Sequence, residues 1–362
     1  VQALIAKHWR IKSVAQASAA HAQLSWDNRA PVSGSLLTMK DAKTKFPVFD
    51  TWETRVVKQP PQFVGWITKH YQNWARANFG PECATEIGNL LAMADRLGEP
   101  KSTGEGEKGS VPRSSRFLPS ALYELEDEDP RKLTSRRFLD AIHLYTQFCS
   151  YKGKIVGTGN RDRYMYWYHF FQSQIELCKM AIYRHRYVES DHRNTDMRNK
   201  LLSGWSKVIT HEMQRVRNVS ELGVIAQLHQ STLIDTIRKE LGIKDSISTT
   251  YKGQAAVRAM PEISMIYADE KFDQKVIFMG NGEITSPVMH YRKIGSSGAF
   301  AQIALIPVNS STRVMKALLP NPGYDFEYYI TGTVGEQPVT YPVTGGKGKT
   351  KINKTVVIWP RQ

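Results

Sequence analysis

The sequence predicts an α+β protein built from more than one domain, and three observations lead to this. The chain has 362 residues, which is too long for one simple hydrophobic core. Through its middle, apolar residues recur at the spacing of amphipathic helices. After Gly242, short β-branched and aromatic runs alternate with Gly, Pro and Asn turns, the pattern of a β-sandwich. We therefore expect a βα unit with a connecting loop, a helical domain and an antiparallel β-sandwich, at residues 1–60, 61–242 and 243–362.

The first segment has the pattern of a strand, a polar turn and a helix. A short apolar run ends in His8, Trp9 and Arg10, and Ser13 can cap the alanine-rich helix that follows. A parallel strand needs neighbours on both sides to be buried. We therefore expect this unit to dock on an upstream N-terminal segment or on a second chain. The chain begins without Met or a signal-peptide pattern, which favours a start partway along a longer protein.

The helical domain is predicted to pack its helices antiparallel in a bundle-like layer. Gly80 is expected to close the first helix, Pro81 to start the second and Ser220 to cap the last. Residues 99–117 are rich in Gly, Ser, Lys and Glu and are predicted to form a mobile surface loop. The helices are expected at 62–79, 81–97, 135–151, from Gly157 onward, 191–216 and 220–241.

The central helix combines a stripe of apolar residues with a polar start. Asp162 suits the first turn, where the macrodipole is positive, but Arg161 and Arg163 oppose it. The two arginines indicate a carboxylate or a hydroxyl-rich partner or, in the simpler interpretation, surface ion pairs. Further along, six residues at helical spacing are expected to pack in the core: Tyr164, Trp167, Phe171, Ile175, Cys178 and Ile182.

The last domain is predicted from about seven short strands. Phe326, Tyr328 and Ile330 alternate with Glu327, Tyr329 and Thr331, as in a strand with one buried face. A Gly-Asn-Gly turn separates two of the strands. The strands are expected near 262–267, 274–279, 288–291, 299–307, 324–331 and 355–359.

Composition and charge narrow the classes of function. The formal net charge is +15, but the basic residues are scattered and no RNA-recognition or nucleotide-fold motif occurs, so we do not expect a nucleic-acid partner. A diffuse positive field suits a sulfated or uronic-acid polysaccharide equally well. No apolar run is long enough to predict a membrane span, and no ligand spacing predicts a metal. The three cysteines are expected to be buried thiols outside any disulfide, with one disulfide as the alternative.

Six short stretches occur in order along the chain, at residues 3–10, 74–80, 159–167, 220–223, 325–330 and 341–342. Together they resemble stretches of a group of large polysaccharide-degrading glycoside hydrolases, the agarase- or glucuronidase-like enzymes of carbohydrate-degrading bacteria. Two positions depart from this pattern. Lys7 stands where a smaller residue is expected, and Tyr341 stands where Trp is expected.

The resemblance implies that the chain is the C-terminal half of a (β/α)₈ glycoside hydrolase. The first segment would then be the last strand and helix of the barrel, followed by the helical domain and the sandwich. The paired carboxylates of such an enzyme would lie on earlier strands, upstream of this chain, so no catalytic residue is assigned. An extracellular or periplasmic location, a polysaccharide or oligosaccharide ligand, and no metal or cofactor are implied as well.

Seven residues are candidates for binding substrate. His8, Trp9 and Arg10 stand at the end of the predicted barrel strand, where Trp stacks on a sugar ring and Arg binds a carboxylate or sulfate. Asn160, Arg161 and Arg163 are expected to reach the same pocket from the central helix. Glu221 is either a further hydrogen-bonding partner of the substrate or a first-turn carboxylate favoured by the helix dipole.

Two other functions remain open from the sequence. The chain could be a non-catalytic carbohydrate-binding or scaffold subunit of a larger assembly, which predicts binding without turnover. A basic nucleic-acid-associated protein is the third interpretation, and it predicts an affinity that falls steeply with salt.

Overall fold

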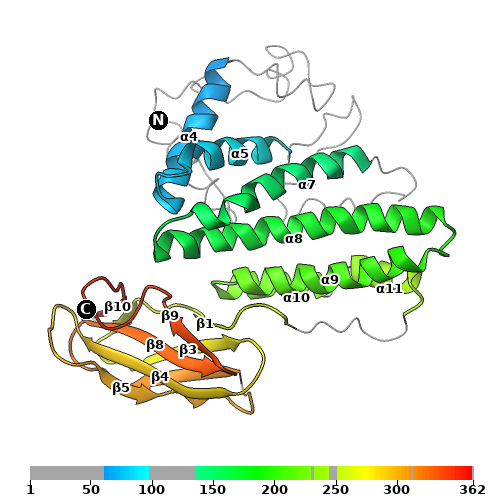
Figure 1. The fold of residues 1–362 in the computed structure, drawn as a ribbon. Coiled ribbons are helices and arrows are strands. Elements are labelled where there is room, and N and C mark those ends of the chain that lie inside the picture. The colour runs from blue at the N-terminus through cyan, green and yellow to red at the C-terminus, as the bar shows by residue number, and fades with distance from the viewer. Residues whose placement is uncertain (1–60, 98–134, 230–231, 244–250, 312, 361–362) are drawn as a thin grey trace. The chain divides into compact units, whose positions relative to one another are not determined.

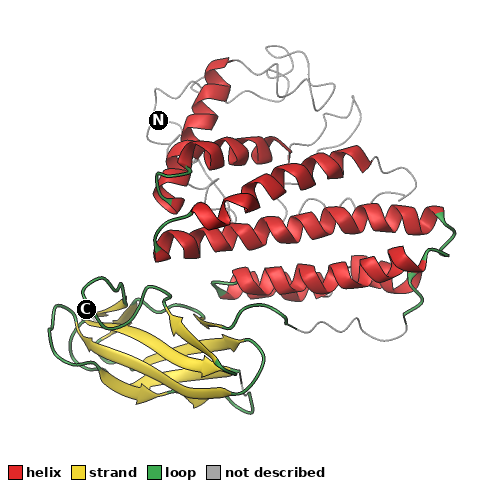
Figure 2. Ribbon diagram, viewed as in Figure 1, coloured by secondary structure: helices red, strands yellow, loops and turns green. Residues whose placement is uncertain are grey.

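A computed structural model describes residues 61–97, 135–229, 232–243, 251–311 and 313–360 (Figure 1). These residues fall into two compact units, one within 1–208 and 226–248 and the other within 209–225 and 249–362. Helices make up the first unit, whereas the second combines a short helical segment with two largely antiparallel sheets (Figure 2). The predicted mixture of helices and antiparallel sheets is therefore confirmed. The predicted βα unit at 1–60 and the loop at 99–117 lie outside the described residues.

The helices follow the predicted order along the chain. α4 packs against α5, and α7 packs against α8, which is 32 residues long. The helices are α4 (Pro61–Phe79), α5 (Ala84–Leu97), α7 (Ser135–Ser150), the 3₁₀ helix η4 (Tyr151–Lys154), α8 (Thr158–Glu189), α9 (Thr195–Arg215), α10 (Val219–His229) and α11 (Thr232–Glu240).

Two helix ends illustrate how local sequence sets the boundaries. Gly80 has φ of 93° and donates its N–H to the Arg76 carbonyl at 3.2 Å, so it closes α4 as predicted. The start of α5 was predicted at Pro81, which was three residues too early. Pro81 begins a turn instead, and its carbonyl accepts the N–H of Ala84 at 3.3 Å.

The aromatic core of the helical unit centres on Tyr164, which is 1% exposed. Its ring stacks on Phe148 with the centroids 5.1 Å apart, and it meets Phe79 edge to face at 5.6 Å. The Tyr164 hydroxyl donates to the Phe148 carbonyl at 2.5 Å, and burial raises the pKa of Tyr164. All six residues of the predicted apolar stripe are buried, so the interpretation of that stripe as core is confirmed.

The second half of α8 is buried on more than one side, and it carries charged residues that are paired. The Arg184 guanidinium binds both carboxylate oxygens of Glu240 at 2.6 to 3.1 Å. Oε1 of Glu176 forms an ion pair with Nζ of Lys179 at 2.9 Å. Gly204 lets α9 approach α8 closely, because a Cβ at this position would lie only 2.8 Å from Cγ of Met180 in α8. Close packing against α9 thus requires a residue without a side chain.

The sheet unit contains a four-stranded sheet in the order β1-β3-β7-β6 and a second sheet in the order β2-β10-β8-β4-β5, with β9 paired to β8. Every pairing is antiparallel except that of β10 with β2. The strands are β1 (Ala256–Ala259), β2 (Met265–Tyr267), β3 (Phe272–Met279), β4 (Ile284–Lys293), β5 (Ala301–Ala304), β6 (Ile306–Pro307), β7 (Val314–Leu319), β8 (Phe326–Val334), β9 (Gln337–Tyr341) and β10 (Lys354–Trp359).

Both sheets contribute to one hydrophobic core, as in a sandwich. Phe272 of β3 packs edge to face on Phe326 and Tyr328 of β8, with centroids 5.2 Å away in each case. Phe326, Tyr328 and Ile330 are all fully buried, so the predicted alternation along this strand is confirmed on its core side. Tyr329 was expected on the exposed side and is nevertheless 3% exposed, because the rings of His290 and Phe300 cover it.

Two helical glycines allow a matched test of packing between α4 and α5. A Cβ on Gly88 would lie 2.5 Å from Cα of Gln72 in α4, whereas a Cβ on Gly223 would meet nothing within 4 Å. We expect Gly88→Ala to destabilise the protein by about 1–3 kcal/mol through overpacking. Gly223→Ala should stabilise it by about 0.5–1 kcal/mol through helix propensity. Urea denaturation followed by circular dichroism measures both, and equal midpoints for the two variants would contradict the packing of α4 on α5.

Candidate functional site

The start of α8 holds three of the residues predicted from the sequence. Its N-cap is Gly157, with φ of 86° and no side chain to cap the helix. Asn160 is not recorded as a cap either, because its acceptor Oδ1 binds Nη2 of Arg163 at 2.6 Å while its Nδ2 donates to the Val156 carbonyl at 3.0 Å. The first N–H groups of α8 therefore have no side-chain cap from these two residues. Asp162 was predicted in the first turn, which was wrong, because α8 already begins at Thr158 and its first turn holds no acidic residue.

The two arginines that oppose the dipole are bound to backbone carbonyls. Nε of Arg161 donates to the Ile155 carbonyl at 2.7 Å, in the segment before α8. Nε of Arg163 donates to the Asn78 carbonyl at 2.8 Å, in the last turn of α4. The carbonyls at a helix C-terminus lack intrahelical partners and carry partial negative charge. The end of α4 thus supplies the partner that Arg163 needs at the positive end of α8.

These bonds orient both guanidinium groups and leave them at the surface. Arg161 and Arg163 are exposed, and Nη2 of Arg163 also donates to Oδ1 of Asn160 at 2.6 Å. Both terminal nitrogens of Arg161 lack a partner within the described ranges of the chain. Two exposed lysines of η4 add to the positive charge, with Lys152 and Lys154 each 5.0 Å from the centre of a tyrosine ring. We refer to Lys152, Lys154, Arg161 and Arg163 as the cationic cluster.

A carboxylate lies next to the cationic cluster. A Cβ on Gly80 would lie 2.6 Å from Oε2 of Glu82 and 2.9 Å from Nδ2 of Asn160, so both side chains approach Gly80 closely. Glu82 is exposed. The start of α8 therefore offers fixed cations for an anionic group together with an amide and a carboxylate that can bind hydroxyl groups.

Glu221 has a structural role at the start of α10. It is 2% exposed, and its Oε2 accepts the N–H of Arg217 at 2.6 Å, while its own N–H donates to Oδ1 of Asn218 at 3.0 Å. This reciprocal arrangement is close to a capping box. The N-cap is therefore Asn218, and the prediction of Ser220 as the cap was wrong because the helix already begins at Val219.

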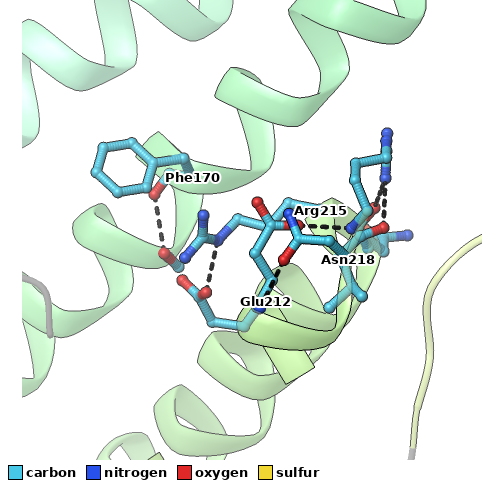
Figure 3. A network of polar contacts seen from close by, with 9 residues as sticks. Phe170, Glu212, Arg215 and Asn218 are labelled. Atoms are coloured by element: carbon cyan, nitrogen blue, oxygen red, sulfur yellow. Dashed lines mark hydrogen bonds and ion pairs between the residues drawn. The ribbon is translucent and has the colours of Figure 1, made fainter. Parts of the chain in front are cut away.

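The last turn of α9, shortly before α10, contains a buried ion pair (Figure 3). Nε of Arg215 lies 2.5 Å from Oε2 of Glu212, and both side chains are at most 3% exposed. A buried pair of this kind costs desolvation for both ions and is strongly destabilising to break. The turn that positions Asn218 and Glu221 is thus held by buried polar groups, which explains its regular geometry without a ligand.

The predicted site residues are brought together only in part. Asn160, Arg161 and Arg163 lie near the start of α8, where Nη2 of Arg163 binds Oδ1 of Asn160. Glu221 belongs to the other compact unit. His8, Trp9 and Arg10 lie outside the described residues.

Sequence reasoning missed an exposed apolar surface on the sheet unit. Met265 and Tyr267 of β2 and Val357 and Trp359 of β10 are 37–51% exposed. The signal was present in β10, where apolar residues occupy both alternating sets of positions, so one set must face outward. We refer to these four residues as the β2–β10 face.

Other reactive groups are buried in the part of the chain that is described. Cys83, Cys149 and Cys178 are buried and form no disulfide there, as predicted, and burial raises the pKa of Cys149 to about 12. A thiol with such a pKa is not a nucleophile at neutral pH. Among the described residues, no group of three or more His, Cys, Asp or Glu side chains could hold a metal ion.

No described helix is both long enough and apolar enough to cross a membrane. No family model matches the chain, and no curated protein matches it. Function is therefore inferred from the residues and their geometry.

Glu221 allows its structural role to be tested against a role in binding substrate. Glu221→Ala leaves the partly buried N–H of Arg217 without its acceptor, so we expect a loss of about 1–3 kcal/mol in unfolding free energy. Glu336→Ala, at an exposed position in the turn between β8 and β9, should change little. Urea denaturation measures the difference. A variant of normal stability that has lost polysaccharide binding would instead make Glu221 a ligand of the substrate.

His290 makes the stability of the sheet unit depend on pH. It stacks on Tyr329 at 4.4 Å, its Nε2 lies 2.9 Å from Thr331, and its buried Nδ1 has no partner among the described residues. Burial and then the Lys347 charge lower the pKa of His290 below the ordinary 6.5. The unfolded state therefore binds the proton first, so stability is complete above about pH 6.5 and falls as the pH drops through the folded-state pKa.

Melting temperatures from pH 8 to pH 5 test this linkage. The wild-type protein should lose more stability on acidification than His290→Gln, which cannot titrate at this position. Parallel curves for the two proteins would show that His290 does not contribute.

Proposed function

We propose that the chain is the C-terminal part of a glycoside hydrolase that acts on a plant or algal polysaccharide with anionic substituents. In this proposal, residues 1–60 complete a (β/α)₈ barrel together with an upstream segment or a second chain. Residues 61–242 form the helical domain and residues 243–362 the sandwich. The enzyme would work outside the cell or in the periplasm. The resemblance of six ordered stretches to agarase- and glucuronidase-like enzymes supports this assignment.

The observation that carries the proposal is the pair of anchored guanidinium groups at the start of α8. Each uses its Nε on a backbone carbonyl, at 2.7 Å for Arg161 and 2.8 Å for Arg163. An arginine held in this way loses less conformational entropy when it binds a ligand. Its planar fork matches the oxygens of a carboxylate or sulfate. The cluster thus favours a uronic-acid or sulfated sugar over a neutral one.

The roles within this site follow from the contacts. Arg161 would bind the anionic group through its terminal nitrogens, with Lys152 and Lys154 adding a long-range attraction. Asn160 orients Arg163 through the bond at 2.6 Å, and Glu82 would accept hydrogen bonds from sugar hydroxyls. His8, Trp9 and Arg10 would complete the pocket from the barrel strand. The general acid and the second carboxylate would come from strands upstream of this chain.

The second candidate is a non-catalytic carbohydrate-binding or scaffold subunit. The observation that favours it is the exposed pair Tyr267 and Trp359 on the sheet unit, because flat aromatic rings at a surface bind the apolar faces of sugars. Turnover separates the two functions. A longer form that includes the upstream strands should release reducing ends from alginate or glucuronoxylan, whereas residues 1–362 alone should bind and not cleave. Native protein without any associated segment that bears a carboxylate pair would leave only the binding function.

The cationic cluster can be tested with one charge-matched pair of variants. Arg161→Ala should bind alginate roughly 10- to 100-fold more weakly, because a charge-assisted hydrogen bond contributes about 1.5–3 kcal/mol. Arg193→Ala removes the same charge from an exposed position in the turn between α8 and α9 and should bind as the wild type does. Retardation in native gels containing alginate, with neutral agarose as a comparison, measures both affinities. Equal retardation of the two variants would argue against a site at the start of α8.

A further inference from the structure

The connection between β9 and β10 concentrates glycine and lysine. Residues 344–351 read Thr-Gly-Gly-Lys-Gly-Lys-Thr-Lys, without an acidic or aromatic side chain. We refer to these residues as the glycine–lysine loop. Lys347, Lys349 and Lys351 are exposed, and none of them forms an ion pair within the described part of the chain. The loop thus carries three positive charges that no described carboxylate neutralises.

Hydrogen bonds hold the two ends of the glycine–lysine loop together. The N–H of Ile352 donates to the Thr344 carbonyl at 2.9 Å, and the Thr344 hydroxyl donates to the Ile352 carbonyl at 2.9 Å. Oδ1 of Asn353 accepts the N–H of Gly346 at 2.9 Å. The loop therefore has a defined shape before it meets a ligand, which lowers the conformational entropy that binding costs.

Two carboxylates near the end of the loop already have partners. Glu327 of β8 accepts hydrogen bonds from Nε of Arg292 and from Nδ2 of Asn353, both at 2.7 Å. Glu262 forms an ion pair with Lys354 at 2.8 Å. These two carboxylates balance the charges of Arg292 and Lys354, so the positive charge of the three loop lysines remains.

The backbone of the loop adds donors to this charge. The N–H groups of residues 347–350 donate to no acceptor within the described ranges, and all four residues are exposed. Gly346 has φ of 139° and Gly348 has φ of 118°, which residues with side chains rarely adopt. Successive N–H groups in a turn are an anion-binding feature. The loop therefore presents backbone donors next to ammonium groups.

We propose that the glycine–lysine loop binds phosphate groups carried in series, as on a small phosphorylated ligand or an inorganic polyphosphate. Three lysines within five residues concentrate more positive charge than one sulfate or carboxylate can neutralise. A phosphate monoester carries a charge of about −1.5 to −2 at pH 7, with three acceptor oxygens. The ammonium groups and the open N–H groups together supply donors for several such oxygens.

The donors of this site come from the loop alone. Gly348, Lys349 and Thr350 match the last three residues of the P-loop motif, but the first glycine of that motif is absent. The loop also leads into the strand β10 instead of a helix, so no helix N-terminus contributes. The site is therefore distinct from a P-loop nucleotide site.

A nucleic acid fits the loop less well, although it also carries phosphates. Single strands are bound by aromatic rings that stack on the bases beside the cations, and residues 342–353 contain no aromatic side chain. Proteins that bind the duplex tightly neutralise roughly 6–10 phosphates, whereas the loop offers three lysines. A compact anion with several charges matches the loop better.

Nuclear magnetic resonance of the whole chain with ¹⁵N-labelled glycine locates the site. Tripolyphosphate should shift the amide resonances of Gly346 and Gly348, and inorganic phosphate and sulfate should do so only at higher concentration. Gly157 reports on the start of α8 in the same spectrum, so binding at the cationic cluster is seen separately. Loss of one resonance in Gly348→Ala assigns that residue.

A charge-matched pair of triple variants tests the lysines by the same titration. Combining Lys347→Gln, Lys349→Gln and Lys351→Gln should weaken tripolyphosphate binding at the loop by roughly tenfold or more, because charge-assisted hydrogen bonds are lost. The control removes the same charge from exposed positions outside the loop and should bind as the wild type does; it combines Lys252→Gln, Lys271→Gln and Lys275→Gln.

A matched pair of glycine variants tests the backbone without changing any charge. A Cβ on Gly348 or on Gly323 meets nothing within 4 Å, and both residues have positive φ. Gly348→Ala disfavours the loop conformation and should weaken binding roughly fivefold. Gly323→Ala, in the turn between β7 and β8, should leave the affinity unchanged. Melting temperatures show that both variants are folded.

Four results would overturn the proposal. They are unshifted Gly346 and Gly348 resonances with tripolyphosphate, equal affinities of the two triple variants, equal affinities for sulfate and tripolyphosphate, and binding of poly(dT) but not of tripolyphosphate at the loop. None of these bears on the polysaccharide proposal, because alginate binding by Arg161→Ala tests the other compact unit. The two proposals can therefore fail independently.

Discussion

The anchoring of Tyr164 in the aromatic core determines how the start of α8 is presented. Its ring lies between Phe148 and Phe79, and its hydroxyl is bound to the Phe148 carbonyl. Since one helical turn contains 3.6 residues, Arg163 lies about a quarter of a turn away from Tyr164, whereas Arg161 lies on the same side as Tyr164 but one turn nearer the start of α8. Both arginines thus reach the ends of neighbouring segments, at Asn78 and Ile155. The exposed guanidinium groups are therefore a consequence of the core that α4, α7 and α8 share.

Two free energies, that of the helix dipole and that of the hydrogen bonds to carbonyls, explain why arginines are stable near the positive end of α8. An unfavourable charge near a helix end costs about 0.3–1 kcal/mol at the surface. A hydrogen bond from a charged group contributes about 1.5–3 kcal/mol, and Arg161 and Arg163 each make such a bond to a backbone carbonyl. The local bonds outweigh the dipole. The unfavourable interaction that remains is the repulsion among the positive charges of the cationic cluster, which a bound anion would reduce.

Periodicity was enough to predict the helices and most strands, because the core is built from regular stripes such as that of α8. Periodicity failed for strands whose residues are not typical of strands. β7 (Val314–Leu319) includes Met, Ala and Leu, which favour helices, and β9 includes Pro338 in a paired strand. At the start of α8, the sequence indicated that Arg161 and Arg163 need partners, but it did not identify those partners. The partner of Arg163 is the Asn78 carbonyl, 85 residues away, and no local pattern indicates such a contact.

The two surfaces described here rely on different physical interactions. The cationic cluster acts through exposed charges, which salt screens over about 10 Å at 0.1 M. The β2–β10 face acts through burial of apolar area and ring contacts, which salt does not weaken in this way. Raising the salt concentration should therefore weaken the attraction of an anion to the cationic cluster and leave the apolar character of the β2–β10 face unchanged. The response to salt thus separates the two surfaces, and each can be assayed on its own compact unit.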